Sequence, residues 1–146
     1  MTFISPTRRS PQLKHGLTLS YFEWGQGGEP ILLLHGLADH GLVWSQLGEY
    51  LTTKYPGKYH IVALDLRGHG ESAKPETGYA CDNYIEDFQT LFEHLGWSQT
   101  HILGHSWAGK FLRDPKYIEI MTFTRAICLE FQESGPARRK IRCFGI

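Results

Sequence analysis

A serine stands between small residues at the end of an apolar stretch. Residues 100–103 (Thr-His-Ile-Leu) precede Gly104, and Ser106 is followed by Trp107 and Ala108. Small neighbours permit the tight strand-to-helix turn that exposes a serine hydroxyl for nucleophilic attack. At the start of the next helix, the backbone N–H of Trp107 can stabilise negative charge on an oxygen. The pattern predicts Ser106 as a nucleophile in acyl transfer and the Trp107 amide as an oxyanion donor.

Two further apolar runs end in loops rich in glycine and polar residues. Residues 31–34 lead into His35 and Gly36, and residues 61–64 lead into residues 65–72, Asp-Leu-Arg-Gly-His-Gly-Glu-Ser. Runs this short and uniformly apolar are typical of strands buried on both faces of a parallel sheet. The polar residues of these two loops are therefore expected at the ends of strands.

Taken in order, the three motifs resemble the N-terminal part of the α/β-hydrolase superfamily, of serine-hydrolase type, over about residues 13–110. The resemblance implies a partial α/β-hydrolase fold with a mostly parallel sheet and flanking helices, its late strands and cap missing. It also implies that the Leu37 N–H is the second oxyanion donor. The implied substrate is a small-molecule ester or amide, with no cofactor and no metal. Serine rather than aspartate at position 106 disfavours the dehalogenase and epoxide hydrolase branches.

A serine nucleophile needs a base, and the base needs an orienting carboxylate. By the resemblance both would follow the serine, yet all eight histidines precede Ser106. The acidic residues that follow it stand in no matching context; they are Asp114, Glu119, Glu130 and Glu133. Two interpretations stay open: a serine hydrolase that is incomplete in this chain, or a catalytically inactive remnant or small-molecule-binding protein with the same fold.

Other polar residues in the two loops favour structural roles. His35 has no carboxylate in its motif to orient it as a base, so we expect it to support its own loop. By the resemblance residues 65–72 are mainly structural, and Asp65 and Arg67 can tie the loop together by charge-assisted hydrogen bonds. We expect His69 to belong to that scaffold.

The remaining pattern alternates strands with helices, which predicts a βαβ architecture. Residues 17–24 are rich in β-formers and predict an early strand at the edge of the sheet. Apolar residues recur at helical spacing in 44–51 and in 84–95, where Gly96 follows as a C-cap.

The family pattern ends near Lys110. Pro115 predicts that the helix after the serine stops after about two turns, and residues 117–131 fit a strand or a helix equally well. We therefore divide the chain into residues 1–110, the N-terminal part of a hydrolase domain, and residues 111–146, a divergent tail that is frame-shifted or disordered. Unless that tail covers the strand at 100–103, its exposed edge favours dimerisation or aggregation.

Composition excludes several classes. The chain has 146 residues, zero net charge and 41% hydrophobic residues, as expected for an ordinary soluble domain. Its three cysteines form no metal-type or disulfide-type spacing, and no signal peptide or membrane span is visible. The basic run at 138–142 lacks interleaved aromatic residues and favours a solvated tail over nucleic-acid binding. We expect a cytoplasmic protein with no nucleic-acid or membrane partner.

Overall fold

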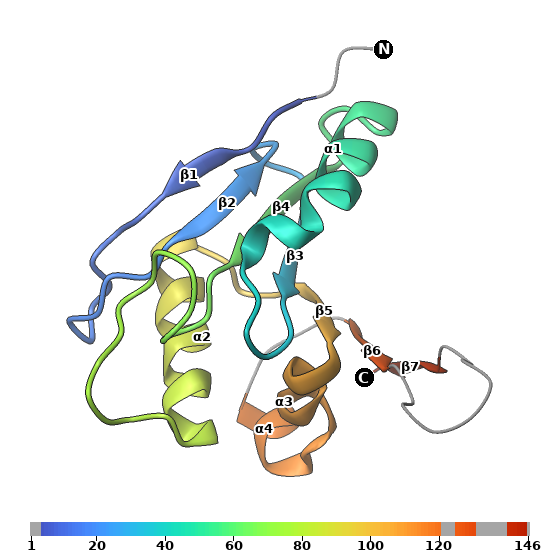
Figure 1. Cartoon of the computed structure of the whole chain (residues 1–146). Coiled ribbons are helices and arrows are strands. Elements are labelled where there is room, and N and C mark those ends of the chain that lie inside the picture. The colour runs from blue at the N-terminus through green and yellow to red at the C-terminus, as the bar shows by residue number, and fades with distance from the viewer. Residues whose placement is uncertain (1–3, 121–124, 131–139, 146) are drawn as a thin grey trace.

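One seven-stranded sheet forms the centre of the molecule, with strand order β1-β2-β4-β3-β5-β6-β7 (Figure 1). The computed structural model describes residues 4–120, 125–130 and 140–145. The strands are β1 (Thr7–Arg9), β2 (Tyr21–Trp24), β3 (Glu29–Leu34), β4 (Tyr59–Leu64), β5 (His101–His105), β6 (Arg125–Glu130) and β7 (Lys140–Gly145). The helical elements are η1 (Gly41–Trp44), α1 (Ser45–Lys54), α2 (Cys81–Leu95), η2 (Ser106–Ala108), α3 (Gly109–Arg113) and α4 (Pro115–Ile120).

The four central strands, β4, β3, β5 and β6, are parallel to one another. Antiparallel strands flank this block, with β2 and β1 on one side and β7 on the other. The predicted α/β class and the three predicted central strands are confirmed. Parallel strands are covered on both faces because helical crossovers join them, and the carboxyl ends of β3, β4 and β5 consequently lead into neighbouring loops.

Helices lie on both faces of the sheet (Figure 1). On β3, Leu32 and Leu34 belong to the same core cluster as Phe88 of α2, whereas Leu33 belongs to the cluster that contains Trp24. This alternation follows from the two-residue period of a strand. Helix α2 ends where predicted, at Gly96, which adopts a left-handed conformation with φ of 69°.

The strand predicted within residues 17–24 is present as β2, but its predicted place at the edge of the sheet was wrong, because Thr7–Arg9 pairs antiparallel with β2 on its outer side. Arg9 bonds the Glu23 carboxylate at 3.0 Å, and the Arg8 guanidinium lies 4.8 Å from the centre of the Phe22 ring. A three-residue strand carrying two arginines has no apolar alternation to reveal it. Short, charged strands of this kind are common at sheet edges.

The strand that leads to Ser106 is not an edge. Strand β6 pairs with β5 in parallel, with Ile102 opposite Ala126, and β7 pairs with β6. The ambiguous segment 117–131 therefore contains both forms, the end of α4 and then β6. Residues 121–124 and 131–139 lie outside the described residues, as do the side chains of the basic run, so the expectation of a solvated tail stays a prediction.

The helix after Ser106 is interrupted where the sequence predicts. Helix α3 ends at Arg113, Asp114 is extended, and Pro115 begins α4. The Asp114 carboxylate accepts a hydrogen bond from the Lys116 N–H at 3.0 Å. An aspartate cap followed by proline in the first helical position is a favoured helix start. Helix α3 buries Phe111 and Leu112 completely.

Candidate active site

Ser106 occupies a strained turn at the carboxyl end of β5. Its φ is 54°, in the left-handed region, and its side chain is exposed. A non-glycine residue pays about 1–2 kcal/mol for this conformation, which persists only when the surroundings enforce it. The predicted strand-to-helix turn is confirmed, and η2 starts at Ser106 itself.

Close packing enforces the turn. A Cβ atom on Gly104 would lie 2.8 Å from Leu112 Cδ1 and 3.3 Å from Ala108 Cβ. On Gly36, a Cβ atom would lie 3.2 Å from His105 Nδ1 and 3.5 Å from Ser106 Cβ. Glycine at 104 therefore lets α3 pack behind the serine, and glycine at 36 lets the loop after β3 run against it.

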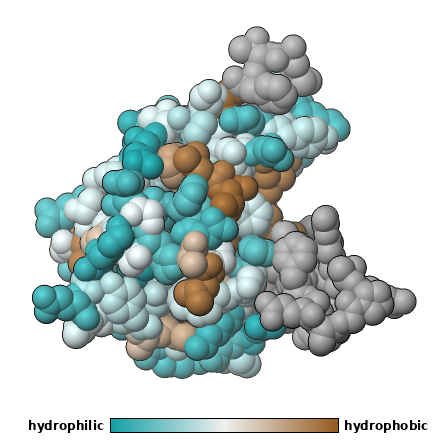
Figure 2. Space-filling model, viewed as in Figure 1, coloured by the Kyte–Doolittle hydropathy of each residue, from teal (hydrophilic) through white to brown (hydrophobic). Residues whose placement is uncertain are grey.

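The structure brings the three candidate site residues to one place. Leu37 follows Gly36 in the loop that touches the turn, and its side chain is 66% exposed. Trp107 is half-buried, with its ring 4.9 Å from that of Tyr84 and 5.0 Å from that of Phe111. Figure 2 shows apolar patches over the connection between β3 and α1 on a face that is otherwise mostly polar. The two candidate oxyanion donors thus belong to the residue after Ser106 and to the loop after β3 that packs against the turn.

His35 is fully buried and uses both ring nitrogens on the backbone. Its Nδ1–H donates to the Gly36 carbonyl at 2.7 Å, and its Nε2 accepts from the Leu66 N–H at 3.0 Å. These partners assign the proton to Nδ1. The ring therefore joins the loop after β3 to the loop after β4, which supports a structural role rather than that of a base.

The loop after β4 is a scaffold for the loop after β3. The buried Asp65 carboxylate accepts hydrogen bonds from the N–H of Gly41 at 2.6 Å and of Glu71 at 3.0 Å. His69 Nε2 accepts from the Ala38 N–H at 3.3 Å, and its Nδ1–H donates to the Arg67 carbonyl at 3.0 Å. These bonds agree with the structural roles predicted for Asp65 and for His69.

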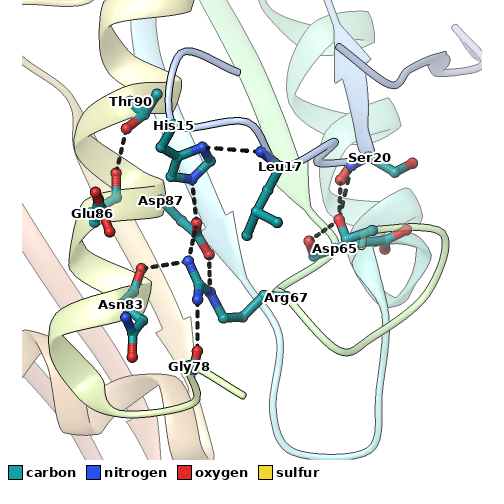
Figure 3. Close-up of polar contacts among 11 residues, drawn as sticks. His15, Leu17, Ser20, Asp65, Arg67, Gly78, Asn83, Glu86, Asp87 and Thr90 are labelled. Atoms are coloured by element: carbon teal, nitrogen blue, oxygen red, sulfur yellow. Dashed lines mark hydrogen bonds and ion pairs between the residues drawn. The ribbon is translucent and has the colours of Figure 1, made fainter. Parts of the chain in front are cut away.

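A buried ion pair fixes the same loop to α2 (Figure 3). Arg67 donates from Nε and Nη2 to the Asp87 carboxylate at 2.7 and 2.6 Å, and from Nη1 to the Gly78 carbonyl at 2.6 Å. His15 Nε2 lies 2.6 Å from the same carboxylate. Sequence reasoning missed Asp87 and His15. A signal was present in the sequence, because Asp87 lies on the face of α2 that otherwise carries Tyr84 and other buried residues. A buried carboxylate needs a charged or hydrogen-bonding partner.

The base and acid of a complete triad are not found in the described part of the chain, where no imidazole or carboxylate hydrogen-bonds the Ser106 hydroxyl. Within the same residues, no group of three or more histidine, cysteine, aspartate or glutamate side chains is arranged to hold a metal ion. No described helix combines the length and apolar character that crossing a membrane requires.

His35 should make stability depend on pH. Burial lowers the pKa of His35 below its ordinary value of 6.5, and the nearby His69 adds to the effect; the Gly36 hydrogen bond, Asp65 and Asp39 oppose it. As the pH falls below about 6.5, the His35 side chain of the unfolded chain takes up a proton before that of the folded chain does. The contribution of neutral His35 to the free energy of unfolding is therefore present above that pH and is lost below it. We expect the melting temperature to fall between pH 7.5 and 5.5.

The contribution of His35 is isolated with His35→Asn, which keeps a donor for the Gly36 carbonyl and cannot titrate. Its melting temperature should depend less on pH than that of the wild type. His94→Asn, at an exposed position of α2, controls for histidine removal in general. Identical pH profiles for the wild type and His35→Asn would contradict the prediction.

The protein has an α/β fold that presents the side chain of Ser106 on a strand-to-helix turn. The loop that contains Gly36 packs against this turn. The sequence model of the alpha/beta hydrolase fold family matches residues 29–113. The chain belongs to this family.

Individual relatives agree with that assignment. The chain is 36% identical over 97 residues to epoxide hydrolase 4 of Homo sapiens, covering 64% of this chain and 26% of the relative. It is 37% identical over 89 residues to a serine hydrolase-like protein of Danio rerio, covering 59% and 26%. It is 38% identical over 99 residues to (E)-2-((N-methylformamido)methylene)succinate hydrolase of Acinetobacter baylyi, covering 65% and 34%. The chain thus spans about a quarter to a third of the length of these relatives.

Solved structures show the same fold. A Vigna radiata epoxide hydrolase mutant superposes with a TM-score of 0.73 at 24% identity, over 84% of this chain and 38% of the other. A putative acyltransferase from Salmonella enterica gives a TM-score of 0.73 at 25% identity, over 90% and 44%. The described arrangement of strands and helices is therefore that of larger α/β-hydrolase-fold proteins.

Proposed function

We propose that this chain carries the nucleophile and oxyanion site of a serine hydrolase that cleaves a small-molecule ester or amide by acyl transfer. Ser106 attacks the acyl carbon, and the backbone N–H groups of Leu37 and Trp107 bind the oxyanion. The observation that carries the proposal is the exposed Ser106 in a left-handed turn at the end of β5, with Gly36 packed against it. Strain of this kind concentrates at functional sites.

The surroundings support a small, partly apolar acyl substrate. Leu37, Leu42 and Val43 expose apolar side chains on the connection between β3 and α1, and Trp107 lies next to the serine. Among the relatives, the Acinetobacter protein is named for hydrolysis of a formamido compound, which fits an amide. Other relatives are named epoxide hydrolases, but a serine hydroxyl is a weak nucleophile that suits acyl transfer assisted by a base.

Turnover requires a base and an acid beside Ser106, and the described residues place neither there. The oxyanion donors alone retain part of the acceleration of acyl transfer, so Ser106 of this chain should still react slowly with an acyl-type electrophile. We also propose that residues 1–110 are the N-terminal part of an α/β-hydrolase domain and residues 111–146 a divergent tail, in a cytoplasmic protein without nucleic-acid or membrane partners. Because β6 covers β5, association through a free sheet edge would involve β1 or β7.

A second candidate function rests on the missing hydrogen bond to Ser106 within the described residues. In this alternative the chain is a catalytically inactive remnant or a small-molecule-binding protein with the same fold. Such a protein keeps the shape of the site without an activated nucleophile.

A fluorophosphonate probe tests the proposal, because it reacts with activated serines. We expect slow labelling of the folded chain that disappears in Ser106→Ala. Ser98→Ala, at an exposed position between α2 and β5, should label like the wild type. Absence of labelling in protein shown by circular dichroism to be folded would sink the catalytic proposal and favour the binding alternative.

A further inference from the structure

Histidine rings hold two successive peptide groups in the loop that touches Ser106. The carbonyl of Gly36 accepts from His35 Nδ1–H at 2.7 Å. In the next peptide group, the N–H of Ala38 donates to His69 Nε2 at 3.3 Å. Leu37 lies between these two held atoms, and its N–H makes no hydrogen bond among the residues that the structure describes.

Holding the Gly36 carbonyl also aims the Leu37 N–H. The two groups belong to one peptide plane, and in a trans peptide the C=O and N–H point in opposite directions. No described peptide bond is cis. A hydrogen bond from His35 to the carbonyl therefore turns the Leu37 N–H away from His35, and this N–H has no partner among the described residues.

The second hydrogen bond fixes the other side of Leu37. Ala38 has φ of 59°, a left-handed conformation that costs a non-glycine residue about 1–2 kcal/mol. The Ala38 N–H bond to His69 helps to hold it there and keeps that N–H from competing with the Leu37 N–H for an anion.

His69 is itself held in place. Its Nδ1–H donates to the carbonyl of Arg67, whose guanidinium is locked on the buried Asp87 of α2. The His69 ring lies 5.1 Å from the His35 ring and 6.4 Å from the Trp107 ring. The His69 ring therefore lies near both the loop that contains Leu37 and the side chain of Trp107, the two residues with candidate oxyanion donors.

We propose that His35 and His69 are positioning residues that clamp the two peptide groups around Leu37 and so preorganise its N–H for an oxyanion. The inference rests on the proposed function of Ser106 and Leu37. It assigns neither histidine as a base, because both nitrogens of each ring are engaged with the backbone. Oxyanion donors stabilise a transition state to the extent that they are fixed before the reaction, which is what a clamp from two loops provides.

The test compares His69→Leu, which removes both ring nitrogens, with His69→Gln, whose side-chain oxygen can accept the Ala38 N–H. With a fluorophosphonate probe on the full chain, the maximal labelling rate should fall about tenfold in His69→Leu. Loss of an oxyanion donor itself costs about 10²–10³ in rate, and here the Leu37 N–H remains but is misdirected. The half-saturating probe concentration should stay unchanged, and His69→Gln should recover most of the rate. His94→Leu serves as the matched control on an exposed part of α2.

A second readout needs no activity. Hydrogen exchange of the Ala38 amide should accelerate in His69→Leu and slow again in His69→Gln, and ¹⁵N NMR should show His35 and His69 protonated at Nδ1. If Ser106 is labelled but Ala38 exchange or the labelling rate is the same in all variants, the clamp is wrong while the proposed function stands. If the folded wild type is never labelled, the proposed function fails and the clamp has no role in catalysis, whatever the exchange shows.

Discussion

Asp87→Leu is expected to lower the free energy of unfolding by about 3–5 kcal/mol, because it leaves the Arg67 guanidinium charged, buried and without its carboxylate. Arg67 is 4% exposed and Asp87 is fully buried, so water cannot replace the lost partner. Two strong hydrogen bonds to Arg67 and one contact with His15 disappear together (Figure 3). Urea denaturation followed by circular dichroism measures the loss.

Two matched variants separate a lost partner from lost volume. Arg67→Met combined with Asp87→Leu removes both charges and should recover much of the stability, since replacing a buried ion pair by apolar residues of similar size is often nearly neutral. Asp82→Leu removes a carboxylate of the same helix that pairs with Lys116 at the surface and should change stability little. A double variant no more stable than Asp87→Leu would refute this account.

Much of the fold can be predicted from short stretches of sequence. Buried parallel strands are uniformly apolar, so residues 31–34 and 61–64 identify β3 and β4 without any knowledge of their partners. The turn at Ser106 is equally local, because Gly104 and Ala108 are the small residues that its close packing demands. Pro115 likewise ends one helix and begins the next by its own backbone chemistry.

Features that depend on partners far apart in the chain could not be predicted in the same way. The bond between His15 and Asp87 joins residues 72 positions apart, and no local pattern pairs them. Strand β1 is defined by pairing with β2, since its sequence, Thr-Arg-Arg, has little intrinsic preference for a strand. The clamp on Leu37 is similarly non-local, because His69 and Ala38 meet only when the loops after β3 and β4 lie side by side.

Phe111→Ala is expected to lower the free energy of unfolding by about 3–5 kcal/mol, the usual cost of emptying a buried phenylalanine site. Phe111 is fully buried, and its ring lies 5.2 Å from that of Tyr84 and 5.5 Å from that of Phe88. These contacts fasten α3 to α2 directly behind the elbow. Thermal and urea denaturation measure the loss, and Lys110→Ala, at the exposed preceding position, is the control.

The Phe111 result also tests how far the folded core extends past Lys110. The side chains of α3 fill the same core as α2, so a large loss would show that the segment after residue 110 begins with residues that the fold needs. Since Leu112 of α3 packs against Gly104, loosening α3 should also relax the strained turn. Labelling of Ser106 by a fluorophosphonate should then weaken in Phe111→Ala and remain unchanged in Lys110→Ala.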